Sequence, residues 1–171
     1  MHKIKGNCEC KKISFEITQE IKYFSHCHCS QCRRCHGSAF ASFIEVDESF
    51  FKYNCCIKNI KSFTSSEYCQ RIFCQICGSN IMFIDGRKPE KYYVSAGTLS
   101  GNISLPKAHH VFVGSKASWY DIDDNLKQHL KYPSNYIDWL LGGRLKKRDL
   151  SFFVKFFKIE IFNKLKIKNH F

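Results

Sequence analysis

Short segments in which apolar and polar residues alternate run through the first three quarters of the chain. In the segment 12–18, KISFEIT, the side chains of Ile13, Phe15 and Ile17 share one face, which is the two-residue period of a half-buried strand. Similar runs lie at 40–46, 60–65, 71–74, 80–84, 91–96 and 109–113. Turn-forming residues separate most of them, and no long amphipathic helix intervenes. The pattern therefore predicts a mainly β domain in which most strands pair antiparallel.

The pattern changes after Tyr132. Ser134 can cap a short amphipathic helix that ends at a Gly-Gly pair. The segment 149–167 combines helically spaced phenylalanines with alternating stretches, and we interpret it as helix. The sequence thus predicts one domain over residues 3–133 and a basic, aromatic, helical C-terminal extension over residues 134–171.

The cysteine content is the most informative feature of the composition. The chain has 11 cysteines in 171 residues, and its first ten residues lack the apolar core of a secretory signal. An odd number of closely spaced cysteines, without a signal peptide, is typical of metal binding in a reducing compartment. No apolar run approaches the roughly 18 residues of a membrane span. We therefore expect a cytoplasmic protein with no membrane span and with reduced thiols.

The net charge of +12 is unevenly distributed along the chain. Residues 144–171 contain nine Lys/Arg and two Asp/Glu, so most of the excess positive charge belongs to the C-terminal extension. This distribution argues against a nucleic-acid-binding surface on the main domain.

Two cysteine pairs from distant parts of the chain have the spacing of a structural zinc site. One pair lies in G-N-C-E-C and the other in F-C-Q-I-C-G, where a glycine follows the second cysteine of a tight turn. Structural zinc takes four ligands in a tetrahedron, and two such pairs supply four thiolates. The predicted ligands of this structural zinc are Cys8, Cys10, Cys74 and Cys77.

A second group, Cys27, Cys29 and Cys32, lies in H-C-H-C-S-Q-C-R-R-C-H-G. Cysteines two apart in a flat strand point to opposite faces, so joint ligation requires a turn in this segment. Three protein ligands leave a fourth position open for water or substrate, as in catalytic zinc sites. The alternative is a second closed site that Cys35 or His28 completes.

Residues near the three-cysteine group and near the end of the domain are further candidates. Arg33 and Arg34 would favour thiolates and attract an anionic substrate. His109 and His110 lie in a strand-like run, so one faces the core and the other faces away from it. We interpret Trp119 as a residue of the core or of a pocket wall.

Five motifs follow one another along the chain: G-N-C-E-C at 6–10, C-H-C-S-Q-C-R-R at 27–34, R-I-F-C-Q-I-C-G-S at 71–79, A-G-T-L at 96–99 and H-V-F-V-G-S-K-A-S-W at 110–119. In these motifs the sequence resembles the glutathione-dependent formaldehyde-activating enzyme family, which is also named for centromere protein V. The resemblance covers roughly residues 3–133. Cys35 departs from the family pattern, in which a small residue is expected, and the C-terminal extension matches none of it.

This resemblance implies an Mss4-like, or β-tent, fold of small twisted sheets around a structural zinc. It implies that Cys8, Cys10, Cys74 and Cys77 hold that zinc, whereas Cys27, Cys29 and Cys32 hold a labile catalytic zinc. The implied activity is that of a carbon–sulfur lyase, which forms or cleaves an adduct between a small thiol such as glutathione and formaldehyde or another small aldehyde. The family is broad, so membership does not fix the substrate.

The sequence leaves two classes of function open. In the enzyme hypothesis, zinc at the three-cysteine group binds the substrate thiol or the aldehyde oxygen. In the alternative, the protein is a non-enzymatic, zinc-stabilised binding module, whose basic C-terminal extension contacts nucleic acid, an acidic partner or a membrane surface.

Overall fold

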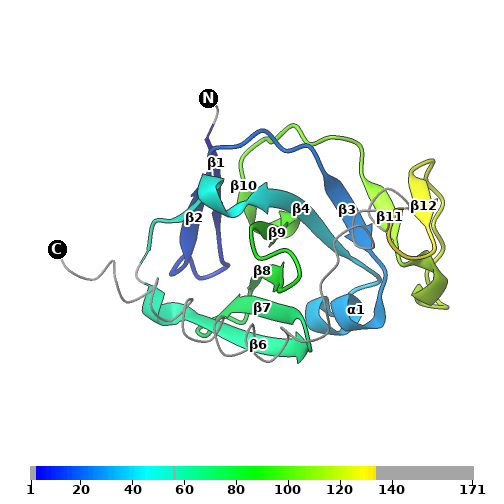
Figure 1. The fold of residues 1–171 in the computed structure, drawn as a ribbon, viewed down its shortest axis with the longest axis horizontal. Helices are drawn as coiled ribbons and strands as arrows, with labels where there is room; N and C mark the ends of the chain where they lie inside the picture. The colour runs from blue at the N-terminus through cyan, green and yellow to red at the C-terminus, as the bar shows by residue number, and fades with distance from the viewer. Residues whose placement is uncertain (1–2, 56, 134–171) are drawn as a thin grey trace. The chain divides into compact units, whose positions relative to one another are not determined.

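A computed structural model describes residues 3–55 and 57–133, which form two β-sheets and one short α-helix (Figure 1). The predicted helical extension over residues 134–171 lies outside the described residues. None of the helices in the described part of the chain is long and apolar enough to cross a membrane.

The smaller sheet has four antiparallel strands in the order β10-β1-β2-β5. They are β1 (Ile4–Asn7), β2 (Ser14–Ile17), β5 (Phe51–Tyr53) and β10 (Leu99–Ser100). The alternation predicted around β2 is confirmed, because Ile13, Phe15 and Ile17 are all buried. The Phe15 ring also stacks on Phe51 of the neighbouring strand, with 5.0 Å between ring centroids.

The larger sheet has eight strands and a mixed topology. In spatial order they are β12 (Lys127–His129), β11 (His109–Val111), β3 (Phe24–Cys27), β4 (Ala41–Asp47), β9 (Lys91–Ser95), β8 (Asn80–Asp85), β7 (Cys69–Cys74) and β6 (Ile60–Ser66). Strand β11 runs parallel to both β3 and β12, and the other strand pairs of the described residues are antiparallel, as the prediction of a mainly antiparallel domain requires. Residues 28–108 separate β3 from β11 and residues 112–126 separate β11 from β12, so the parallel pairing is feasible.

Short helices lie at the strand junctions. The α-helix is α1 (Ser30–His36), and the four 3₁₀ helices are η1 (Glu48–Phe50), η2 (Ile57–Asn59), η3 (Ala96–Thr98) and η4 (Val113–Ser115). The chain passes from the larger sheet to the smaller one twice, through η1 between β4 and β5 and through η3 between β9 and β10. Helix α1 lies beside the end of β6, where the Gln31 side chain donates a hydrogen bond to the Ser65 carbonyl.

All seven strands predicted from alternation are present, and the mainly β fold of small twisted sheets is confirmed. Strand β4 is at the centre of the larger sheet and is covered on both faces. Ile44 and Val46 are buried on one face, and Ala41 and Phe43 are buried on the other. The second face packs against Cys27 and the other members of a cluster that contains two cysteines of the three-cysteine group.

We predict that Gly6→Ala destabilises the protein. A Cβ at this position would lie 2.2 Å from Cζ of the buried Phe15 ring and 2.8 Å from the backbone oxygen of Thr98. Relief of such overlap requires β1 and β2 to separate, and we expect a loss of at least about 2 kcal/mol in the free energy of unfolding. Chemical denaturation measures this loss. The control is Gly97→Ala, whose Cβ meets nothing within 4 Å; an equal loss in both variants would contradict the explanation.

Candidate metal centres

The four cysteines predicted to form one site converge in the structure. The sulfur atoms of Cys8, Cys10, Cys74 and Cys77 all lie within 4.8 Å of one another. The Cys8 and Cys10 sulfurs are 3.5 Å apart, and the Cys10 and Cys74 sulfurs are 3.8 Å apart. A tetrahedral zinc–thiolate site with bonds of about 2.3 Å separates its sulfurs by about 3.8 Å, so these cysteines have the spacing that a metal ion requires.

Two tight turns present these four sulfur atoms. Cys8 follows β1, and the backbone N–H of Lys11 donates to its carbonyl at 2.9 Å. Cys74 ends β7, and the backbone N–H of Gly78 donates to its carbonyl at 2.9 Å; Gly78 adopts φ = +76°, a conformation that favours glycine. The Ser79 hydroxyl accepts a hydrogen bond from the backbone N–H of Glu9 at 3.1 Å, which ties the two turns together.

Backbone and hydroxyl donors surround the sulfurs of this cluster. The Ile13 backbone N–H donates to the Cys8 sulfur at 3.2 Å, and the Ser79 hydroxyl lies 3.2 Å from the Cys77 sulfur. The hydrogen bond from Ser79 lowers the pKa of Cys77 to about 5. Hydrogen bonds of this kind favour the thiolate, which is the form that binds metal.

The three-cysteine group is assembled at a junction between a strand and a helix. Cys27 is the last residue of β3, Cys29 is the N-cap of α1, and Cys32 lies in the first turn of that helix. The Cys29 sulfur accepts a hydrogen bond from the Cys32 backbone N–H at 3.4 Å. The predicted change of chain direction is therefore present, but it takes the form of a helix start. All three sulfurs lie within 4.8 Å of one another, and that set does not extend to Cys35 or His28.

An apolar, largely aromatic layer surrounds the three-cysteine group. Cys27 and Cys32 are buried in a cluster with Phe43, Tyr93 and other apolar residues, and Cys29 and Phe83 pack against it. The Phe83 ring stacks on Tyr93 at 4.5 Å and meets Phe43 edge-on at 4.8 Å. The protein therefore shields these sulfurs from water on the side of the core, and Cys29 is the most exposed of the three.

One cation, Arg71, reaches a sulfur of this group from β7. Its guanidinium donates to the Cys32 sulfur at 3.5 Å and to the Ser65 hydroxyl at 3.1 Å. Arg33 instead donates to the Ser115 carbonyl at 3.3 Å, and the side chain of Arg34 is exposed. The sequence analysis therefore proposed the adjacent Arg33 and Arg34 and missed Arg71, which contacts the cluster. No local sequence signal shows which residue of a distant strand lies beside these cysteines.

The three thiols influence one another strongly. Hydrogen bonds from Cys27 and Cys32 lower the pKa of Cys29, whereas the hydrogen bond to Cys29 and burial raise the pKa of Cys27. Three close sulfurs cannot all become thiolates in an apolar environment without a neutralising cation. A bound divalent metal supplies that charge, and cysteine thiolates are ligands that suit zinc.

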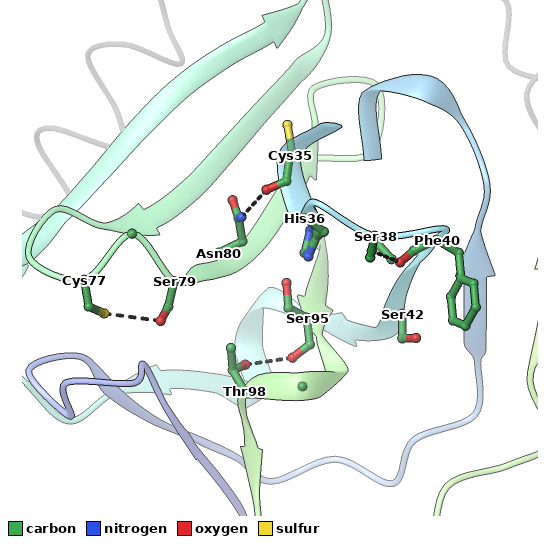
Figure 2. Close-up of a pocket in the computed structure, with 13 residues that line it drawn as sticks. Cys35, His36, Ser38, Phe40, Ser42, Cys77, Ser79, Asn80, Ser95 and Thr98 are labelled. Carbon is green, nitrogen blue, oxygen red and sulfur yellow. Dashed lines mark hydrogen bonds between the residues drawn. The ribbon is translucent and has the colours of Figure 1, made fainter. Parts of the chain in front are cut away.

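A pocket of about 540 Å³ lies between α1, β8 and η3 (Figure 2). Its polar wall includes the side chains of His36, Asn80 and Ser95, and Gly97 of η3 also lines it. Burial lowers the pKa of His36 to about 4, so its imidazole is neutral near neutral pH. The Ser95 hydroxyl faces His36 (Figure 2), and among the described residues it has no hydrogen-bond partner although Ser95 is 5% exposed.

The pocket and the three-cysteine group share structural elements. Helix α1 carries Cys32 near one end and His36 at the other, and Ala41, which lines the pocket, pairs with Cys27 across β3 and β4. Asn80 fixes the C-terminal end of α1, because its side-chain amide donates to the Cys35 carbonyl at 2.8 Å. None of the three cysteines lines the pocket itself.

A hydrogen-bonded chain that runs from two buried histidines to an exposed carboxylate lies beside the same segment. The His28 Nε2 atom is 2.7 Å from His110 Nδ1, and His110 Nε2 is 3.0 Å from a carboxylate oxygen of Asp124. Sequence reasoning placed one of His109 and His110 in the core, which is confirmed because His110 is 1% exposed while His109 is half-buried. The prediction for Trp119 is wrong, because this side chain is 70% exposed.

Comparison with known proteins fits this arrangement. The model of one protein family, the glutathione-dependent formaldehyde-activating enzymes, matches residues 3–115, which is more than half of the chain. The chain belongs to this family. The match includes all seven cysteines of the two clusters.

Two curated relatives cover most of the domain. An uncharacterized lyase of Schizosaccharomyces pombe is 29% identical over 121 residues, which is 71% of this chain and 86% of the relative. A putative glutathione-dependent formaldehyde-activating enzyme of Halomonas elongata is 25% identical over 129 residues, which is 70% of this chain and 81% of the relative. A crystal structure of a Rhodobacter sphaeroides protein has 23% identity and a TM-score of 0.48, covering 60% of this chain and 97% of its own.

We predict that this family member loses metal from each cluster separately. Cys74→Ser should lower the zinc content by one equivalent and cost a sizeable part of the roughly 10 kcal/mol that a structural zinc site contributes to folding. Cys29→Ser should lower the zinc content by one equivalent while the fold persists, because its cluster has other apolar packing. Native mass spectrometry and thermal unfolding measure both effects. Cys55→Ser, outside both clusters, is the control, and unchanged zinc in both test variants would refute the assignment.

Proposed function

We propose that the protein is a zinc-dependent enzyme of the carbon–sulfur lyase type, which forms or cleaves an adduct between a small thiol and a small aldehyde. The proposal rests on one observation, the convergence of three cysteine sulfurs. Among the described residues, no fourth potential ligand atom belongs to this group. Such a set leaves one coordination position for a substrate, whereas the four-cysteine cluster is saturated. In this proposal Cys8, Cys10, Cys74 and Cys77 hold a structural zinc, and Cys27, Cys29 and Cys32 hold a catalytic one.

The reaction joins two small molecules and needs no oxidant. In the forward direction the sulfur of the thiol bonds to the carbonyl carbon of the aldehyde, and the proton of the thiol ends on the former carbonyl oxygen. Zinc held by Cys27, Cys29 and Cys32 would lower the pKa of a bound thiol or polarise a bound carbonyl. The layer of Phe43, Phe83 and Tyr93 excludes water from one side of this centre, which strengthens electrostatic interactions there.

We further propose that the pocket beside α1 receives the part of the thiol substrate that lies beyond its sulfur. A volume of about 540 Å³ is within the range of about 300–1,000 Å³ that small-molecule sites occupy. The unpartnered hydroxyl of Ser95 and the neutral His36 can bond to uncharged polar groups, such as the amides of a peptide-like thiol. Glutathione carries two such amides, and the names of the family and of the Halomonas relative include glutathione.

The boundaries of the proposed enzyme follow the described domain. Residues 3–133 contain both clusters and the pocket, so we assign the chemistry to them and treat residues 134–171 as an extension. The alternative of a binding module depends on that extension, which lies outside the described residues. Thiolate ligands require a reducing environment, which agrees with the expected cytoplasmic location.

The activity should depend on the three-cysteine group. The purified, zinc-loaded protein should accelerate adduct formation between glutathione and formaldehyde above the uncatalysed rate, as followed by NMR of the S-hydroxymethyl product. Cys29→Ser should return the rate to background, since the ligand set is broken, while Cys55→Ser should keep the rate of the natural sequence. Absence of acceleration across a panel of small thiols and aldehydes by the loaded protein would rule the proposal out.

A larger side chain in the pocket should raise KM more for long thiols than for short ones. A Cβ added at position 97 meets nothing within 4 Å, so Gly97→Leu can place an isobutyl group at the pocket. We expect KM to rise by about tenfold for glutathione and much less for 2-mercaptoethanol, because only the longer thiol reaches the filled space. The smaller change Gly97→Ala should give an intermediate ratio of the two KM values. Equal increases for both thiols would place the substrate elsewhere.

A further inference from the structure

Arg71 is a buried cation whose electrostatic partners are cysteines. The residue is 4% exposed, and none of the carboxylate ion pairs of the described residues includes it. Its guanidinium lies 5.7 Å from the centroid of the Phe83 ring and donates to the Cys32 sulfur and to Ser65. A buried charge without a carboxylate requires another source of negative charge.

The sulfur atoms around Arg71 supply this charge. The Cys32 sulfur lies 3.5 Å from the guanidinium, and as a thiolate it carries a negative charge. The guanidinium is therefore stable in the interior because it faces a centre that is itself negative. Three thiolates around a divalent ion carry one net negative charge, which a single arginine balances.

We propose that Arg71 is the counter-ion of the three-cysteine centre and that it makes this centre prefer an anionic fourth ligand to a neutral one. The inference rests on the proposed function, because it requires a metal ion at Cys27, Cys29 and Cys32. Without Arg71, an anionic ligand such as a thiolate would give the buried centre two net negative charges. With Arg71 in contact with Cys32, the same anionic ligand leaves only one net negative charge on the centre. A neutral ligand such as imidazole is not stabilised by the charge of the arginine.

This assignment gives Arg71 a specificity role that differs from metal binding. Arg71 contributes no ligand atom, and it acts through Cys32, so it is a positioning and charge-balancing residue. The preference for a thiolate selects the thiol, and not the aldehyde oxygen, as the group that occupies the open position. Arg34 provides a matched comparison, because it is an exposed arginine on α1, two residues from Cys32, and the surrounding water screens its charge.

The test uses the full-length protein with cobalt(II) in place of zinc. The d–d and sulfur-to-cobalt absorption bands report on both clusters, and subtraction of the Cys29→Ser spectrum isolates the three-cysteine centre. The centre is titrated separately with 2-mercaptoethanol and with imidazole, at one fixed pH at which imidazole is neutral. The measured quantity is the ratio of the two affinities, in the natural sequence and in Arg71→Gln, Arg71→Lys and Arg34→Gln.

We expect Arg71→Gln to lower the ratio of thiol to imidazole affinity by about tenfold or more, because the variant keeps a hydrogen-bond donor but removes the charge. Arg71→Lys and Arg34→Gln should stay within about threefold of the natural protein. An unchanged ratio in Arg71→Gln would overturn the inference, as would an equal loss in Arg34→Gln. If Arg71→Gln does not fold, Arg71→Lys decides: a retained ratio supports the counter-ion role and a lost ratio overturns it.

The same data separate this inference from the proposed function. If the natural protein and Cys29→Ser give identical cobalt spectra, the three-cysteine centre takes no metal, and both proposals fail. If the spectra differ but the ratio of thiol to imidazole affinity is the same in Arg71→Gln as in the natural protein, the metal centre is supported and the role of Arg71 is refuted.

Discussion

The convergence of reduced sulfur atoms from distant segments is the constraint on which the architecture depends. Cys8 follows a strand of the smaller sheet, and Cys74 ends a strand of the larger sheet. The hydrogen bond from the Glu9 backbone N–H to the Ser79 hydroxyl links the turns that carry them. A metal ion at this point would join the two sheets, so its binding free energy would contribute to folding.

Alternation and cysteine spacing allowed much of the fold and both clusters to be predicted, because both are local properties of the sequence. Seven strands and the two sets of converging cysteines follow from such patterns. The strands that were not predicted, β1, β3, β5, β10 and β12, have two to four residues each and offer little alternation to detect. Helix α1 completes only about two turns, so its apolar face gives no helical signal. The parallel pairing of β11 depends on connections that alternation does not describe.

The surroundings of the three-cysteine group could not be predicted in the same way. Arg71 is separated from Cys32 by 39 positions, and their contact depends on how β7 lies beside α1. The pocket likewise combines Asn80, Ser95 and His36, which belong to three different elements. The sequence supplied the reactive group, whereas tertiary packing supplied the charge and the shape around it. Trp119 illustrates the converse error, because its aromatic character suggested burial that the packing does not provide.

The two clusters use the same ligand type and each contains two buried cysteines, but the remaining cysteines differ in exposure. A divalent ion with four thiolates carries two net negative charges, and the four-cysteine cluster lies where Cys77 is exposed and Cys10 is half-buried. Water and backbone donors can solvate that charge. With a divalent ion the three-cysteine group would carry one charge fewer, and the buried Arg71 lies at the sulfur of Cys32. Water can thus solvate the cluster with the more exposed cysteines, whereas the cluster packed against aromatic side chains has a cation beside it.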